Sequence, residues 1–281
     1  MFARIRRGWE LTKKSWGVIR SHPGLIRLPI YGGLLALLFG AVFALPGAIL
    51  LAGDGASTGA QVAGVALIAV GSYLASFFVI YYNVALAAAA DQALNGQEPD
   101  LRKARGVARG RVGVIAEWAL VSAIVSLAFS LLRDRGGVVG GIGASLGAAL
   151  WSLVTFLVVP VLAFEGIGPF SAIKRSTNLF RQRWGEQVTG NVAIGGIAGI
   201  AVMIGALIVA GGVALLAAGE TGTEIVGGVL LLAGLVIAIA AAVFGGAAKG
   251  VFGVALYRYV AESRIVGPFT APDLESAART R

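Results

Sequence analysis

Two serines of the chain lie in the G-x-S-x-G pattern of hydrolase nucleophiles, in GASTG at 55–59 and GASLG at 143–147. Such a nucleophile needs a strand-to-helix turn and a histidine partner. In the membrane topology that the charges favour, the single histidine, His22, lies on the opposite side from Ser57 and Ser145. We therefore expect neither serine to be catalytic, and the sequence contains no P-loop, G-x-G-x-x-G or H-E-x-x-H motif.

The cysteine and histidine content limits the remaining chemistry. Without cysteine the chain has no disulfide, no thiolate nucleophile and no cysteine-ligated metal. One histidine is too few for a multi-histidine zinc site. The sequence thus predicts no catalytic residue, no metal and no cofactor.

Three polar residues inside apolar runs are the best candidates for a functional site. Glu117 lies near the start of one run, Lys249 lies near the end of another, and Asn83 follows two tyrosines in a third. Ionisable residues within membrane spans are costly and often functional. The functional interpretation is a polar pocket in which Glu117 and Lys249 could pair. The alternative is that each group reaches lipid headgroups or water at the membrane surface.

The elements that carry these residues are long apolar runs. The chain is 57% hydrophobic and 13% charged, with a mean hydropathy of +0.85, whereas soluble chains carry roughly 25% charged residues. Each run is long enough for a helix that crosses about 30 Å of hydrocarbon, and none alternates as a barrel strand does. We predict an all-α polytopic membrane bundle with six transmembrane helices, at 28–51, 62–90, 112–132, 137–164, 189–218 and 225–260.

Basic residues are concentrated in every second connection between these runs. Of the 23 lysines and arginines, only Arg133 and Arg135 lie on the other side. The positive-inside rule then places both termini in the cytoplasm. Because this topology accounts for the pI of 10.4, we expect no nucleic-acid partner. The first run is too long for a cleaved signal peptide, so we interpret it as a span in the plasma membrane.

A basic stretch with helical periodicity precedes each pair of runs. The apolar stripes are Phe170, Ile173, Thr177, Phe180, Trp184 and Val188; Phe2, Ile5, Trp9, Thr12, Trp16 and Ile19; and, more weakly, Leu101, Ala104, Ala108 and Ile115. These stripes predict three amphipathic helices on the cytoplasmic surface. The cations expected to contact anionic membrane lipid are Arg4, Arg6, Arg7, Lys13, Lys14, Arg102, Lys103, Arg105, Arg109, Arg111, Lys174, Arg175, Arg181 and Arg183. The alternative is that they only fix the orientation of the spans.

The unit of one basic helix and two spans recurs three times. We predict a single membrane domain, 1–281, built from repeats at 1–96, 97–165 and 166–268 with a short tail at 269–281. Each second span ends in an acid followed by glycine and proline, as in Glu165, Gly168 and Pro169. Two spans per unit give all units one orientation, so the repeat is of the parallel kind.

Two of the runs, 62–90 and 225–260, are longer than a helix that crosses the membrane requires. As one helix, 225–260 would measure about 54 Å, so we expect it to break near Gly245, Gly246 or Gly250, or to extend into the cytoplasm. Asn83, Pro160 and Gly253 are similarly placed in the three units and could be bends around a cavity. The 42 glycines predict closely packed helices with little bulk between them.

The stretches MFARIRRGWELTKKSW and GPFSAIKRSTNLFRQRWGEQ resemble an uncharacterised family of six-helix prokaryotic membrane proteins, a domain of unknown function. The resemblance covers most of the chain and rests on Phe2, Arg7, Trp9, Leu11, Lys13, Ser15, Trp16, Pro169, Phe170, Ser176 and Trp184. It implies the six-helix architecture and a prokaryotic plasma membrane. It carries over no functional residue, because that family has no assigned activity.

Three functions agree with these features. The first, which we expect, is a non-enzymatic membrane protein that organises anionic lipid or partner proteins at the cytoplasmic face; the sequence does not identify the protein partners. The second is a transporter or permease for a lipid or small molecule, because parallel repeats are one transporter plan. The third is a lipid-modifying membrane enzyme, for which the sequence offers no nucleophile, metal site or acid–base pair.

Overall fold

The computed structural model describes residues 2–53, 57–135, 137–184, 193–218 and 223–276. These residues form helices and connecting loops, with no strand among them, so the all-α fold class is confirmed. The helices are α1 (Phe2–Ser21), α2 (Gly24–Ala52), α3 (Thr58–Leu94), α4 (Leu101–Gly110), α5 (Val112–Arg135), α6 (Gly137–Val154), α7 (Val158–Phe164), α8 (Pro169–Trp184), α9 (Ala193–Ala218), α10 (Thr223–Glu262) and α11 (Ala271–Ser276).

Most of the long helices are those that the apolar runs predicted. Within the described ranges, five stretches are long and apolar enough to cross a membrane, namely α2, α3, most of α5, α10 and the combined stretch Gly143–Phe164. Within α9, the apolar stretch Ala201–Ala217 is shorter. These helices indicate a membrane protein, as the composition predicted.

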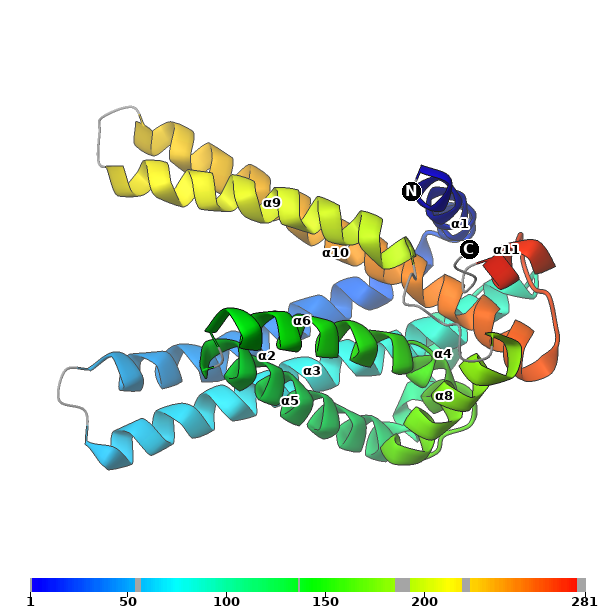
Figure 1. Ribbon diagram of the computed structural model, residues 1–281, viewed down its shortest axis with the longest axis horizontal. Coiled ribbons are helices and arrows are strands. Elements are labelled where there is room, and N and C mark those ends of the chain that lie inside the picture. Colours follow the sequence, from blue (N-terminus) through cyan, green and yellow to red (C-terminus); the bar gives the residue numbers. More distant parts are fainter. Residues whose placement is uncertain (1, 54–56, 136, 185–192, 219–222, 277–281) are drawn as a thin grey trace.

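The long helices pair as hairpins, α2 with α3, α5 with α6, and α9 with α10. Figure 1 shows that the α2/α3 hairpin and the α9/α10 hairpin lie close to each other near one end of the molecule and diverge from each other toward their loops. The short helices α4, α8 and α11 gather at the end opposite the hairpin loops. We call this end, which carries α1, α4, α8 and α11, the junction end.

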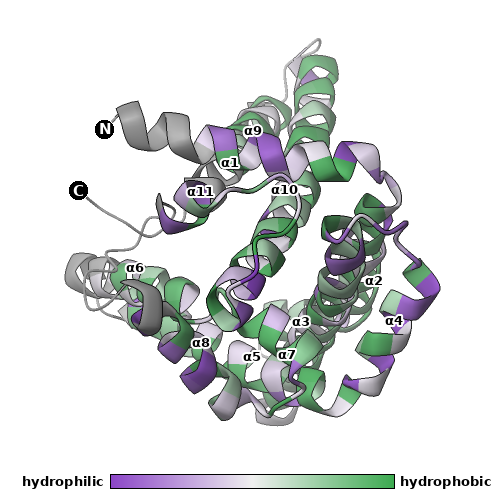
Figure 2. Ribbon diagram, turned by 90° about the vertical axis from the view of Figure 1, so that its right-hand side faces the viewer, coloured by the Kyte–Doolittle hydropathy of each residue, from purple (hydrophilic) through white to green (hydrophobic). Residues whose placement is uncertain are grey.

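The second helices of the hairpins, α3, α10 and the segment α7 that follows α6 within its predicted span, form the core at the junction end. α3 packs against α7 and α10, and α10 also contacts α7. The small side chains of Ala85, Ala89 and Ala90 on α3 are fully buried there, which lets the helices approach closely. Each basic helix lies on one of these three, α4 on α3, α8 on α7 and α1 on α10. Viewed from this end, α1, α4 and α8 lie at the periphery, where hydrophilic residues gather (Figure 2).

The predicted span 137–164 is not one continuous helix. α6 ends at Val154 and α7 begins at Val158, and the intervening turn is held by short-range bonds from the Phe156 amide to the Leu153 carbonyl (3.2 Å) and from the Val158 amide to the Thr155 carbonyl (3.0 Å). Pro160 explains the break, because proline lacks an amide donor and its ring clashes with the carbonyl four residues earlier. The bend expected at Pro160 is therefore a helix break just before it.

Of the two alternatives for 225–260, a break or an extension into the cytoplasm, the structure shows no break. α10 is continuous for 40 residues, through Gly245, Gly246 and Gly250, and measures about 60 Å. α3 likewise continues through Asn83 over 37 residues. Glycine weakens a helix but keeps its amide donor, so close packing against other helices is sufficient to hold these segments helical. Of the three suggested weak points, the structure breaks only the one that contains proline.

Two buried serines occupy corresponding places on the basic helices α1 and α8. Ser176 on α8 donates a hydrogen bond to the Val154 carbonyl (2.6 Å), which the helix break deprives of its usual amide partner. Ser15 on α1 is equally buried, but its hydroxyl has no partner among the described residues. The two hydroxyls therefore contribute unequally to stability.

We expect Ser176→Ala to lower the free energy of unfolding by about 1 to 3 kcal/mol, because it leaves the Val154 carbonyl buried and unpaired. Ser15→Ala is the matched control and should change the free energy by less than about 0.5 kcal/mol, since it removes a hydroxyl that no described residue bonds. Denaturant unfolding of both variants in detergent micelles measures the difference. Equal losses in the two variants would contradict the assigned role of Ser176.

Candidate functional site

A cavity of about 550 Å³ lies between α3, α5, α6, α7 and α10. Its polar lining consists of Ser76, Asn83, Ser122, Ser152, Thr155 and Lys249. Lys249 is the one charged residue in the described lining. Two of the three residues predicted for a polar pocket, Asn83 and Lys249, thus face the same space.

The third predicted pocket residue, Glu117, lies elsewhere. It lines a separate hollow of about 390 Å³ together with the first residues of α8. There its carboxylate approaches Gly168, just before the α8 N-terminus, where a negative charge complements the helix dipole. No ion pair joins Glu117 to Lys249 among the described residues, so the suggested pair does not form. Glu117 and Lys249 come from different helices, and the sequence could not fix which sides of those helices face each other.

Lys249 is partly buried and has no polar partner among the described residues. Its Nζ lies 5.6 Å from the centre of the Phe156 ring, a cation–π distance. A lysine ammonium in an apolar span ordinarily pairs with an acid, a carbonyl or water. Here the ammonium group is directed toward the cavity, and no acid among the residues that the structure describes pairs with it.

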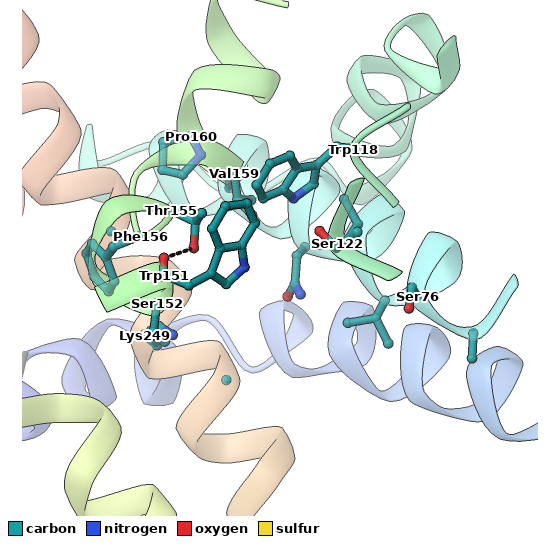
Figure 3. A pocket seen from close by; sticks show the side chains of 18 residues that line it. Ser76, Trp118, Ser122, Trp151, Ser152, Thr155, Phe156, Val159, Pro160 and Lys249 are labelled. Carbon is teal, nitrogen blue, oxygen red and sulfur yellow. Dashed lines mark hydrogen bonds between the residues drawn. The ribbon is translucent and has the colours of Figure 1, made fainter. Parts of the chain in front are cut away.

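The cavity has an aromatic wall that the sequence did not predict. The rings of Trp118 on α5 and Trp151 on α6 are stacked, with centroids 5.7 Å apart and planes 19° apart (Figure 3). These two residues are remote in sequence and share no periodic pattern, so only the packing of α5 on α6 brings them together. A stacked pair of this kind offers a flat apolar surface to a ligand.

The helix break between α6 and α7 borders the cavity. Thr155, at the break, donates its hydroxyl to the Trp151 carbonyl (2.7 Å), and Thr155, Phe156 and Pro160 all line the space. Irregular backbone at membrane depth is stable only when buried in protein or facing a wet cavity. The break therefore sits where such a cavity exists.

The cavity extends from about the middle of the long helices toward the junction end. Its lining begins at Ala75 on α3 and at Gly246 on α10 and continues toward the junction end as far as Ala87 and Gly253. This extent corresponds to about 18 Å along α3. No described lining residue precedes Ala75 on α3 or Gly246 on α10, so the cavity does not reach the hairpin loops and its shape is a pocket.

An ion-pair cluster that sequence reasoning missed joins the second helices near the junction end. Arg258 on α10 binds both oxygens of Asp91 on α3, with Nε–Oδ1 and Nη2–Oδ2 distances of 2.8 Å, and it also contacts Glu262. On the other side, Glu165 accepts bonds from Tyr257 (2.9 Å) and from Arg175 (2.9 Å). The acids at the ends of the spans were noticeable in the sequence as repeat markers, but their partners were not.

The predicted lipid-contacting cations fall into three groups. Exposed at the surface are Lys13, Arg102, Lys103, Arg105, Arg109, Lys174 and Arg181. Lys14, Arg175 and Arg111 are instead engaged within the fold, Lys14 by Asp273, Arg175 by Glu165, and Arg111 by packing across Gly166. The side chains of Arg4, Arg6, Arg7 and Arg183 lie outside the described residues.

Acids near two of the basic helices have shifted pKa values. Burial tends to raise the pKa of Asp273, but hydrogen bonds from Lys14 and Thr270 outweigh it and hold that pKa below its ordinary value. The pKa of Asp100, which caps the N-terminus of α4, is lowered mainly by the hydrogen bond from the Lys103 amide. Both carboxylates therefore stay ionised and neutralise part of the local positive charge.

The apolar stripes predicted for α1 and α8 are only partly the buried faces. On α1 the stripe residue Ile19 is buried together with Leu11, Ser15 and Val18, whereas Trp9 and Trp16 of the stripe are exposed. On α8 Ala172, Ser176 and Leu179 are buried, and Phe170 is 76% exposed. Small and aliphatic side chains thus pack against α10 and α7, and the described aromatic residues of the stripes remain outside.

Comparison with known proteins identifies the family of the chain. No curated protein and no solved structure is similar to it. Among the described residues, no three His, Asp or Glu side chains gather as they would around a metal ion. The model of one protein family, described as a family of unknown function (DUF6159), matches residues 62–267, well over half of the chain. The resemblance noted in the sequence is confirmed, and the chain belongs to this family of unknown function.

Proposed function

We propose that the chain is a non-enzymatic integral membrane protein that binds anionic lipid at the cytoplasmic face of a prokaryotic plasma membrane. In this proposal all six apolar runs span the membrane, both termini are cytoplasmic, and the junction end lies at the cytoplasmic surface. The distribution of lysine and arginine supports the orientation, because nearly all of them belong to the junction end or to connections that lead to it.

Two features support the proposed threefold repeat. Each basic helix packs on the second helix of another hairpin, in a closed cycle of α1 on α10, α4 on α3 and α8 on α7. A glycine with positive φ follows each second helix, Gly96 at 75°, Gly166 at 64° and Gly267 at 64°. Such a φ strains any residue with a Cβ, so the three junctions share a backbone requirement.

The exposed cations of α1, α4 and α8 are the observation that carries the lipid-binding proposal. Lys103, Arg109 and Lys174 are all exposed, and Lys13 lies beside the exposed Trp9 at 5.6 Å from its ring centre. Amphipathic aromatic rings favour the membrane interface, and each nearby cation gains about 1 kcal/mol from anionic headgroups. The junction end therefore combines both features that an anionic membrane surface attracts.

The test is the lipid that the protein enriches around itself in nanodiscs of mixed phosphatidylglycerol and phosphatidylcholine. We expect the triple variant Lys103→Gln, Arg109→Gln, Lys174→Gln to lower phosphatidylglycerol enrichment, with about a fivefold loss of affinity at each neutralised position. Arg133→Gln, an exposed cation at the hairpin-loop end, is the matched control and should change little. Unchanged enrichment in the triple variant, or an equal effect per charge in the control, would contradict the proposal.

Transport is the second candidate function, and the cavity favours it. A pocket beside a broken helix is a common form of transporter site. Transport, however, also requires the site to open toward the hairpin-loop end, where the described cavity lining does not extend. Lipid binding without transport is therefore the function that we propose first.

A further inference from the structure

We propose that the cavity beside Lys249 binds one anionic amphiphile, a molecule with a phosphate or carboxylate group and a hydrocarbon chain. This site is separate from the exposed cations of α1, α4 and α8, so it goes beyond the surface binding of lipid. The volume of about 550 Å³ is within the range of pockets that hold small organic ligands.

The charge of the cavity selects an anion. Lys249 is the one charged group in the described lining, and no described residue forms an ion pair or hydrogen bond with it. A phosphate or carboxylate that entered the cavity would therefore meet a single uncompensated positive charge. Such a pair is much stronger in an apolar surrounding than in water.

Hydrogen-bond donors in the lining complete the polar half of the site. Asn83, Ser122 and Ser152 make no hydrogen bond with other described residues, so their amide and hydroxyl groups remain available. Serine hydroxyls and the asparagine amide donate to the oxygens of phosphate or carboxylate. Together with Lys249 they provide donors from α3, α5, α6 and α10.

The remaining lining is apolar and selects a hydrocarbon chain. The stacked Trp118 and Trp151 rings and Phe156 form this part of the wall (Figure 3). Val79 and Ile80 of α3 also line it. A free inorganic anion would leave these surfaces in contact with water, whereas a chain would cover them. The combination of one cation, a few donors and an aromatic wall therefore fits an amphiphile better than a bare anion.

The experiment titrates dodecyl phosphate into the full chain in a neutral detergent and follows tryptophan fluorescence, because Trp118 and Trp151 lie in the cavity wall. We expect saturable binding that Lys249→Gln weakens by about tenfold or more and that Lys249→Arg largely retains. Loss of an unpaired buried charge should not unfold the protein, so Lys249→Gln remains interpretable. Dodecanol, which has the chain without the charge, should bind at least about tenfold more weakly.

Two further measurements accompany this titration. Inorganic phosphate distinguishes a bare anion from an amphiphile, and the triple variant distinguishes the cavity site from the surface cations. Inorganic phosphate should bind far more weakly than dodecyl phosphate; equal binding would overturn the assignment of an amphiphile. The triple variant Lys103→Gln, Arg109→Gln, Lys174→Gln should bind dodecyl phosphate as the unchanged chain does. Undiminished binding in Lys249→Gln would overturn the cavity site, whatever the nanodisc measurement shows for the surface cations.

Discussion

Replacing Arg258 with methionine is expected to lower the free energy of unfolding by about 3 to 5 kcal/mol. The guanidinium binds Asp91 through two parallel bonds of 2.8 Å, and the side chains of the pair are only 14% and 19% exposed. Methionine would fill a similar volume but leave the Asp91 carboxylate largely buried without its cation. An unpaired buried charge costs far more than the intact pair contributes.

The position of Arg258 adds to the expected effect. It lies on α10, its main partner Asp91 lies on α3, and its Cζ is 4.4 Å from the ring centre of Phe164 on α7. One side chain thus contacts all three second helices near the junction end. Its removal should loosen the contact between the hairpins as well as the ion pair.

Denaturant unfolding in detergent measures this prediction, with Arg264→Met as the matched control. Arg264 is 55% exposed and bonds to Asn95 and Glu262, so its replacement should cost less than about 1 kcal/mol. The double variant Asp91→Leu, Arg258→Met removes both charges and should be more stable than Arg258→Met alone. If Arg258→Met costs no more than Arg264→Met, the cluster does not hold the hairpins together.

The long helices and the three short basic helices were predictable because their signals are local. A continuous apolar run determines a spanning helix through its own length, and a basic stretch with period 3.6 becomes a helix wherever it docks. Pro160 lacks an amide donor, but Pro29 and Pro46 lie within the continuous helix α2, so a proline alone does not determine where a helix breaks. Glycine at 245, 246 and 250 also gives no local signal that decides between a break and a continuous helix, so only packing could decide that α10 remains continuous.

The features that the sequence did not reveal depend on how separate helices face each other. The separation of Glu117 from Lys249, the Trp118–Trp151 stack and the Arg258–Asp91 pair each require a rotation of one helix against another. The burial of α8 depends on the same geometry, since Ala172, Ser176 and Leu179 are buried whereas Phe170 of the predicted stripe is exposed.

The close approach of α2 and α3 leads to the other large expected effect, at Gly47. A Cβ at this position would lie 2.7 Å from the Gly64 carbonyl oxygen and 2.8 Å from Cγ1 of Ile68. The contact is reciprocal, because a Cβ at Gly64 would lie 2.8 Å from the Gly47 carbonyl oxygen. A backbone oxygen cannot rotate away as a side chain can, so the helices themselves must move apart.

We expect Gly47→Ala to lower the free energy of unfolding by about 3 kcal/mol, at the upper end of what overpacking costs. Gly33→Ala is the matched control on the same helix, since nothing lies within 4 Å of a Cβ there. It should be neutral or stabilise the helix by up to about 1 kcal/mol, because alanine favours helix more than glycine does. A loss of stability in Gly47→Ala and a gain in Gly33→Ala would show that the close contact between α2 and α3, and not the glycine content of α2, determines the stability of this hairpin. A loss at Gly33 equal to that at Gly47 would contradict the close crossing of α2 and α3.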